Sequence, residues 1–339
     1  MNVLVTGGAG YIGSYAVRKL LDKNHNVIVV DNLSTGFVQA IDTRAMFYQV
    51  DIRDKSKLDA IFKKHNIDLV MHFAAKLIAP ESVQKPLEYY DNNVNGSNTL
   101  LRVMYENNVN KIVFSSTAAV YGLLDKGDDA IYETDPTAPI NPYGYTKLVV
   151  ENMIKDASNA YGLQYIIFRY FNVAGGVRLG NPLKETALIP RLLLTANGFH
   201  DKFYIFGNDY HTKDGTCIRD YVHVEDLVDA HILAAEKMYE EKHENGIYNL
   251  GNEKGFTVFE IYEKAQKVTD KTIPMEFAER REGDPVISVA SSEKAQSLLG
   301  WKPVYKNVEQ IILSAWVDTY ERHTKVRRTK QEHTILAKA

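Results

Sequence analysis

The chain has 339 residues, of which 45% are hydrophobic and 24% charged, and its formal net charge is −3. This is the composition of an ordinary globular protein, long enough for one large domain or two. The small net charge argues against a nucleic-acid or acidic-membrane partner, no apolar run is long enough to span a bilayer, and the ten histidines form no metal-binding motif.

The first third of the chain alternates short apolar segments with amphipathic ones. Strands are predicted at 2–7, 26–31, 67–75, 111–116 and 164–172. Helices are predicted between them, at 14–24, 58–66 and 96–108. Apolar strands that alternate with helices are typical of a parallel sheet covered on both faces. The expected fold class is therefore α/β, with a doubly wound Rossmann sheet.

The pattern changes after about residue 173, where glycine, proline and polar residues become frequent. One clear helix follows at 257–269, and Thr257 and Glu260 at its start have the spacing of a capping box. We expect a cofactor-binding domain at 1–173 and a smaller α/β substrate lobe at 174–339. Segments such as 219–240 are expected to pack back on the first domain, and the polar tail from about His323 to fray.

A glycine-rich segment, "TGGAGYIG" at 6–13, separates the first strand from the first helix. Gly7, Gly10 and Gly13 allow a tight turn, and the helix N-terminus that follows favours the pyrophosphate of a dinucleotide. Asp31 ends the second strand, where a carboxylate accepts both ribose hydroxyls and repels a 2′-phosphate. The expected cofactor is therefore NAD rather than NADP. Asp51, after the third strand, is placed to meet the adenine.

The segment "NPYGYTK" at 141–147 places Tyr143 four residues before Lys147 and Tyr145 two before it. On a helix, only Tyr143 shares a face with Lys147. Thr117 ends another strand, at the edge where doubly wound sheets bind ligands. Lowering the pKa of a phenol from about 10 to about 7 needs roughly 4 kcal/mol, which we expect from the Lys147 ammonium and a positive nicotinamide ring. Tyr143 would then act as a general base.

These motifs resemble the extended, nucleotide-sugar branch of the short-chain dehydrogenase/reductase superfamily. Within that branch the chain is similar to the UDP-glucose 4-epimerase family over nearly its whole length. The resemblance rests on segments that include "VTGGAGYIGS", "VDNLSTG", "FSSTAAVYG", "NPYGYTK", "RYFNVAG" and "FGNDYHTKDGTCIRDYVHVEDL". It implies inversion of C4 of UDP-glucose and UDP-galactose through a transient 4-keto sugar, with NAD regenerated in each cycle. It also implies a homodimer, and the single cysteine, Cys217, excludes internal disulfides and fits a reducing cytoplasm.

The resemblance assigns roles by matching positions. Tyr143, Lys147 and Thr117 would be catalytic, with Thr117 bonded to the sugar 4-oxygen. The cofactor would be held by Gly7, Gly10, Tyr11, Ile12, Gly13, Asp31, Asn32, Asp51, Ile52, Phe73, Ala74, Asn92, Tyr143 and Lys147. The UDP-sugar would be held by Thr117, Tyr143, Asn172, Leu188, Arg219, Tyr221, Arg281, Asp284 and Ser288. Cys217 is expected to be a packed residue rather than a nucleophile.

The chain departs from many relatives at three places, Leu77, Ala187 and the 175–186 loop, and Ser288 bears on its substrate range. A cofactor-contacting lysine of the family aligns with Leu77, and Lys76 stands one residue earlier. Ala187 replaces a nucleotide-binding asparagine or histidine, and the 175–186 loop is short. Ser288 aligns with a tyrosine in members confined to UDP-glucose and UDP-galactose and with a small residue in members that accept N-acetylated sugars. The resemblance therefore implies that UDP-GlcNAc and UDP-GalNAc are also substrates, unless Ile287, Val289 or the short 175–186 loop refills the space that Ser288 leaves.

Two alternatives stay open. Another enzyme of the branch, such as a 4,6-dehydratase, would need carboxylates directly after Thr117, where this chain has Ala118 and Ala119. A non-catalytic NAD-binding sensor would be expected to lose one of Thr117, Tyr143 and Lys147, and this chain keeps all three.

Overall fold

The computed structural model describes residues 1–124, 126–127, 129–176 and 186–317. The predicted tail from His323 and most of the 175–186 loop lie outside these residues. None of the helices in the described ranges combines the length and the apolarity that crossing a membrane requires.

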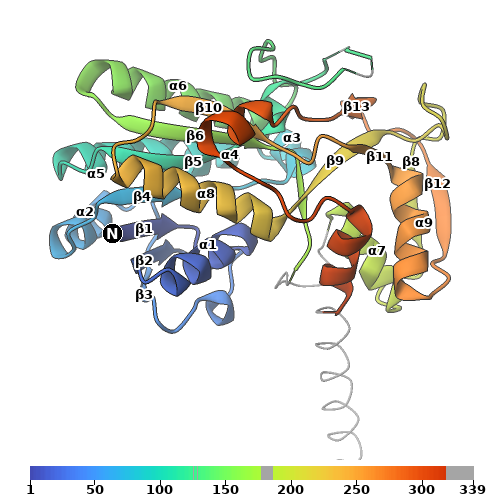
Figure 1. Cartoon of the computed structure of the whole chain (residues 1–339), viewed down its shortest axis with the longest axis horizontal. Coiled ribbons are helices and arrows are strands. Elements are labelled where there is room, and N and C mark those ends of the chain that lie inside the picture. The colour runs from blue at the N-terminus through green and yellow to red at the C-terminus, as the bar shows by residue number, and fades with distance from the viewer. Residues whose placement is uncertain (125, 128, 177–185, 318–339) are drawn as a thin grey trace, which may run out of the picture.

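A parallel sheet of seven strands forms the centre of the larger part of the molecule (Figure 1). Its strands lie in the order β10-β6-β5-β4-β1-β2-β3, and every neighbouring pair is parallel. Their bounds are β1 Asn2–Thr6, β2 Asn26–Asp31, β3 Met46–Gln49, β4 Leu69–His72, β5 Lys111–Thr117, β6 Gln164–Tyr170 and β10 Gly246–Leu250. The predicted fold class is confirmed.

Helices cover both faces of this sheet, as the apolar strands require. On one face, Val3 and Val5 of β1 pack in a core with α1 (Tyr11–Asp22) and α8 (Val224–Tyr239). On the other, Leu4 packs in a second core with α2 (Lys55–Lys64), α5 (Gly96–Glu106) and α6 (Pro142–Tyr161). Alternate residues of one strand therefore belong to different cores.

Short helical segments line the carboxyl edge of the sheet. α3 (Ala79–Gln84) and α4 (Pro86–Tyr89) pack on α6. The π-helix η2 (Tyr90–Asn95) runs directly into α5. Two 3₁₀ segments within the described residues are η1 (Val38–Ala40) and η3 (Ala118–Val120).

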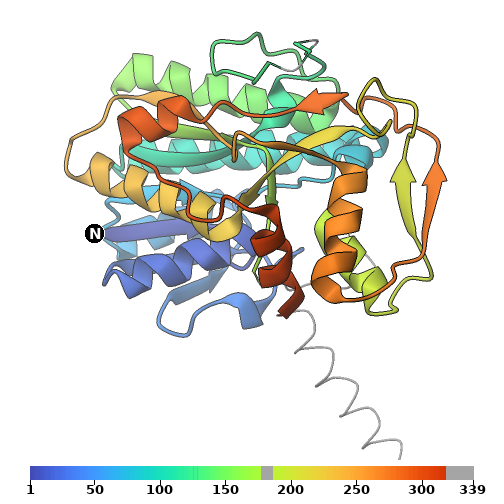
Figure 2. The same cartoon turned by 45° about the vertical axis from the view of Figure 1, so that its right-hand side comes forward.

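A second, smaller lobe begins where β6 ends. β7 (Asn172–Ala174) pairs with β9 (Ile218–His223), which lies between β11 (Gly255–Thr257) and β13 (Ile287–Ser288). A third core holds this lobe together, under α7 (Leu188–Ala196), α9 (Val258–Thr269), the helical residues 308–317, and the pair β8 (Phe203–Phe206) and β12 (Met275–Ala278). Figure 2 shows this lobe beside the sheet, and η5 (Ala295–Leu299) packs on α8.

The predicted boundaries differ from the structure at two informative places. α1 begins at Tyr11, before the predicted Ser14, because Gly10 already caps the helix. The predicted strand 164–172 is two strands, since β6 ends at Tyr170 and Asn172 belongs to β7 in the other sheet.

Candidate active site

The turn between β1 and α1 is built so that main chain can lie close to a ligand. A Cβ at Gly13 would lie 2.2 Å from the Gly7 carbonyl oxygen, and one at Gly7 would lie 2.6 Å from the Ala74 nitrogen. Gly7 also has a φ of +73°, which favours glycine. Gly10 caps α1 without a side-chain hydrogen bond, so no side chain competes with an anion for its N-terminal N–H groups. This cradle, which Tyr11 and Ile12 continue, fits a pyrophosphate.

Asp31 stands at the carboxyl end of β2, beside this turn. Its Oδ2 accepts a hydrogen bond from the Ala9 nitrogen at 3.0 Å, and its Oδ1 accepts one from the Leu33 nitrogen at 2.8 Å. A carboxylate has about four acceptor positions, so half of them remain for ribose hydroxyls. The buried carboxylate thus ties the glycine turn to the end of β2.

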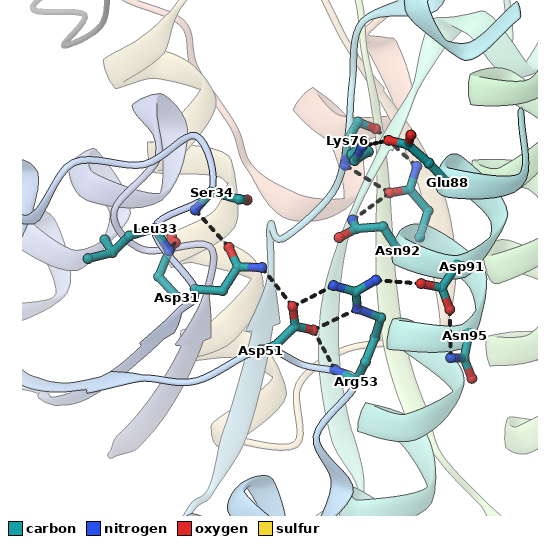
Figure 3. Close-up of polar contacts among 12 residues, drawn as sticks. Asp31, Leu33, Ser34, Asp51, Arg53, Lys76, Glu88, Asp91, Asn92 and Asn95 are labelled. Atoms are coloured by element: carbon teal, nitrogen blue, oxygen red, sulfur yellow. Dashed lines mark hydrogen bonds and ion pairs between the residues drawn. The ribbon is translucent and has the colours of Figure 1, made fainter. Parts of the chain in front are cut away.

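Asp51 is more heavily engaged than the sequence suggests (Figure 3). Its Oδ1 accepts from the Arg53 nitrogen and Nε, both at 2.9 Å, and its Oδ2 accepts from Asn32 Nδ2 at 2.8 Å and Arg53 Nη2 at 2.7 Å. Chiefly the Arg53 hydrogen bond holds the pKa of Asp51 well below its usual range. All four acceptor positions are used, so an adenine amine would have to replace one of these donors. The adjacent Ile52 is buried.

The end of β4 and the helix η2 supply the next group of residues. The Phe73 nitrogen donates to the Thr6 carbonyl at 3.0 Å, which places Phe73 and Ala74 against the glycine turn. Asn92 donates to Asn93 Oδ1 at 3.0 Å (Figure 3). Lys76, which stands one residue before the usual lysine position, forms a 2.5 Å ion pair with Glu88 on α4. In this structure its ammonium is therefore bound to protein.

The start of α6 separates the two tyrosines of the 141–147 segment. Asn141 caps the helix by accepting from the Gly144 nitrogen, and the Tyr143 nitrogen donates to Ser82 Oγ at 3.1 Å. Lys147 is 3% exposed and donates from Nζ to the Ser115 carbonyl at 2.7 Å, whereas Tyr145 is 47% exposed. Only Tyr143 thus shares the inner face with Lys147.

Burial dominates the electrostatics of this pair. Burial raises the pKa of Tyr143, and a hydrogen bond with Thr117 lowers it by a smaller amount. Burial also lowers the pKa of Lys147 to about 7, against the attraction of Glu151. Burial therefore outweighs the hydrogen bond with Thr117, and the pKa of Tyr143 lies above its ordinary value. A further positive charge beside the phenol is needed to make it a base near pH 7.

Several predicted substrate residues lie on one face of the small sheet. Asn172 is opposite Tyr221, and Ser288 is opposite Arg219. Because successive strand residues alternate between faces, Arg219 and Tyr221 share a face with Asn172 and Ser288. The residues that flank Ser288 point the other way: a Cβ at Gly255 would touch Val289 and Ile218.

The two predicted arginines gather around Cys217. Arg219 donates from Nη1 to the Pro285 carbonyl at 2.7 Å, and its Nη2 lies 3.5 Å from Asp284 Oδ1. Arg281 stacks on the ring of Phe206, 3.8 Å from its centroid. Both arginines and Asp284 act electrostatically on Cys217, whose thiol pKa is raised by burial. Cys217 is therefore a packed residue of the third core. Leu188 is the first residue of α7, directly after Ala187, which caps that helix without a side-chain bond.

Sequence reasoning missed two charged residues of the site. Arg53 holds Asp51, and Glu151 follows Lys147 by one helical turn on the same face. The spacing of Tyr143, Lys147 and Glu151 was the available signal for the second. In the ranges that the structure describes, no group of three or more His, Cys, Asp or Glu side chains is placed to hold a metal ion.

Known proteins are similar to this chain in sequence and fold over almost its whole length. The model of the NAD dependent epimerase/dehydratase family matches residues 3–251. A UDP-glucose 4-epimerase of Halalkalibacterium halodurans is 51% identical over 93% of this chain and 95% of its own length. A crystal structure of a UDP-glucose 4-epimerase, 50% identical, superposes with a TM-score of 0.91 over 95% of this chain and 98% of that one.

A third match comes from Campylobacter jejuni. The structure of its UDP-Glc/GlcNAc 4-epimerase is 39% identical, with a TM-score of 0.84 over 94% of this chain and 99% of that one. The family model, the similar sequences and the similar structures all point to the same family. The chain belongs to the NAD dependent epimerase/dehydratase family and, within it, to the UDP-glucose 4-epimerases.

Proposed function

We propose that this enzyme inverts C4 of UDP-glucose and UDP-galactose, with NAD as its cofactor. The observation that carries the proposal is the inner face of α6, where Tyr143 and the buried Lys147 stand beside Thr117 at the carboxyl edge of a dinucleotide-binding sheet. The fit of the glycine turn to a pyrophosphate and the position of Asp31 support the cofactor.

Tyr143 acts as the general base on the sugar 4-hydroxyl, and Thr117 hydrogen-bonds the same oxygen. When bound, NAD supplies a reversible hydride acceptor and the positive charge that favours the Tyr143 phenolate. C4 loses its hydride and the 4-hydroxyl loses its proton, which gives a 4-keto sugar. The keto sugar turns its other face to the site, and the hydride and the proton then return to it. Tyr143 then donates the proton back to O4, so no net oxidation occurs and no cofactor is consumed.

The proposal assigns the remaining contacts to residues of both lobes. Asp31, Asn32, Asp51, Ile52, Phe73, Ala74 and Asn92 hold the cofactor along the sheet edge. Arg219 and Arg281 hold the pyrophosphate of the UDP-sugar, since a guanidinium matches phosphate oxygens. Asn172, Leu188, Tyr221 and Asp284 complete this pocket. The division into a cofactor domain at 1–173 and a UDP-sugar lobe at 174–339 stays a prediction.

The activity is tested by incubating the purified protein with UDP-galactose and no added NAD, alongside an absorbance scan. We expect conversion to UDP-glucose and the absorbance of bound nicotinamide cofactor. Absence of conversion with or without added NAD would contradict the proposal. Formation of a 4-keto-6-deoxy sugar would favour the dehydratase instead.

N-acetylated sugars are the finer part of the substrate proposal. Ser288 faces the side of the small sheet that carries Arg219, and its neighbours Ile287 and Val289 point to the opposite face with Ile218. Neither neighbour therefore fills the space that a larger residue at 288 would occupy. UDP-GlcNAc and UDP-GalNAc are accordingly proposed as a second substrate pair.

A homodimer in the cytoplasm completes the proposal. The packed group α3, α4, α5 and α6 exposes apolar side chains outward, among them Leu87 at 81% and Val83 at 63%. Such a patch is expected to be covered by a partner. Light scattering should give a dimer for the wild type and a monomer for Leu87→Glu, whereas Leu298→Glu, on η5, should leave the dimer intact. A monomeric wild type would contradict it.

A further inference from the structure

Lys147 is an ammonium in an unusually poor place for a charge. It is 3% exposed, its Nζ donates to the Ser115 carbonyl at 2.7 Å, and it lies 4.9 Å from the centroid of the Phe114 ring. A buried ammonium tends to lose its proton unless a negative charge compensates it. The proposed reaction needs this group charged, because a neutral amine would not favour the Tyr143 phenolate.

The compensating charge stands one turn further along the same helix. Glu151 is fully buried, and its Oε1 accepts from Ser116 Oγ at 2.5 Å and from Arg169 Nε at 3.0 Å. Its Oε2 accepts from Arg169 Nη2 at 2.6 Å. These three donors fix the carboxylate on the i, i+4, i+8 line of Tyr143, Lys147 and Glu151. Arg169 itself lies over the Tyr121 ring, 4.8 Å from its centroid.

Two other titratable groups beside this line, His72 and Tyr170, are neutral in the working range, whereas Arg169 of β6 carries a positive charge that is paired with Glu151. On β4, burial lowers the pKa of His72 to about 3, and on β6, burial raises the pKa of Tyr170. On α4, burial chiefly raises the pKa of Tyr89, with a smaller contribution from Tyr143, and the Tyr89 hydroxyl donates to Glu81 of α3.

The remaining elements packed on α6 bring neutral groups. η2 contributes Asn93, which donates to Thr146, and η3 is the apolar segment Ala118–Val120. α5 contributes Ser97, which is bonded to His72. Glu151 is therefore the charged side chain that acts on Lys147.

We propose that Glu151 is a positioning residue that keeps the Lys147 ammonium charged beside Tyr143. The inference rests on the proposed function and assigns Glu151 no contact with the substrate or the cofactor. Ser116 and Arg169 orient its carboxylate. The active helix face thus carries three groups in series, a phenol, an ammonium and a carboxylate, of which the last sets the charge of the second.

The test is the pH dependence of kcat with UDP-galactose. Loss of the Lys147 proton limits activity at high pH, so kcat falls on the alkaline side of its pH profile, here called the alkaline limb. Glu151→Gln should move this alkaline limb to lower pH by about one unit. Glu151→Asp, which keeps the charge, should restore much of the wild-type limb. A limb in Glu151→Gln that coincides with the wild type would overturn the proposal.

Arg169→Lys is the matched control. It keeps both charges and loses the paired hydrogen bonds of the guanidinium, so the unfolding midpoint should fall while the alkaline limb stays in place. If Arg169→Lys moved the limb as far as Glu151→Gln, the role would be structural and the proposal wrong.

A double variant covers the case in which Glu151→Gln fails to fold, because it leaves Arg169 unpaired. Glu151→Gln with Arg169→Met removes the buried pair as a whole, which proteins often tolerate. Its alkaline limb should also move to lower pH, and an unmoved limb would overturn the proposal. Inactivity of the wild type, by contrast, would contradict the proposed function itself.

Discussion

At the scale of single residues, Tyr143 and Tyr145 stand on opposite sides of α6 although one residue separates them. Tyr143→Phe removes the proposed base and little packing, so kcat should fall by about 10²–10⁴-fold while bound NAD is retained. Tyr145→Phe changes an exposed side chain and should leave kcat within about twofold. Steady-state kinetics on both variants check this, and equal losses would refute the helical-face argument.

Ser288 gives the second prediction at this scale. Ser288→Tyr places a ring on the face of β13 that Arg219 shares, so kcat/KM for the N-acetylated pair should fall at least about tenfold. The UDP-glucose and UDP-galactose pair should keep its activity, as should both pairs in the control Ser288→Ala. Wild-type enzyme without N-acetyl activity would contradict the proposal, as would a Ser288→Tyr variant that retains that activity fully.

At the scale of elements, the start of α9 shows how much a cap contributes. The Glu260 nitrogen donates to Thr257 Oγ1 at 3.0 Å, the Thr257 nitrogen donates to Glu260 Oε2 at 2.9 Å, and Thr257 Oγ1 donates to Asp214 at 2.5 Å. Thr257→Ala should lower the free energy of unfolding by about 2 kcal/mol.

Urea unfolding measures this loss. Thr99→Ala is the control, since its hydroxyl donates to the Asn95 carbonyl one turn earlier, and the change there should be under about 0.5 kcal/mol. Equal effects of the two substitutions would contradict the capping argument.

The elements also show what sequence can and cannot predict. The capping box of α9 is confirmed because its donors and acceptors lie within four residues. The strands β1, β2 and β5 were predicted well, since apolar runs and turn residues are local signals. β10 joins the sheet through pairing with β6, and no local signal shows which distant segment fills an edge.

The residues of the site likewise fall into those that local sequence predicts and those that depend on distant packing. The glycine turn and the Tyr143–Lys147 spacing are short motifs that can be read directly. Arg53 could not be assigned, because its bond to Asp91 depends on where η2 packs.

At the scale of the whole molecule, buried histidines make stability depend on pH. Burial lowers the pKa of His72 to about 3 and those of His223 and His231 to about 4, whereas an unfolded histidine titrates near 6.5. The unfolded chain therefore takes up protons first, and stability should fall as pH drops from about 6.5 to 4. Each histidine contributes a slope of about 1.4 kcal/mol per pH unit.

Two carboxyls oppose this trend. Burial raises the pKa of Asp220 to about 7 and also raises the pKa of Asp226, so protonation of these groups stabilises the folded state as pH falls. The three histidines outweigh them. Urea unfolding at pH 7.5 and pH 5 should show lower stability at pH 5, and His231→Phe should reduce the difference. Equal stability at the two pH values would contradict the prediction.

The pairing of β10 with β6 has a consequence for how the chain folds as it is made. β6 ends at Tyr170, but its partner ends at Leu250, about 80 residues later. At roughly 5–20 residues per second, ribosomes expose the open edge of β6 for about 4–16 s. An open apolar strand edge is a site for association with other chains. The nascent chain is therefore most vulnerable between these two points, and chaperones would give most protection there.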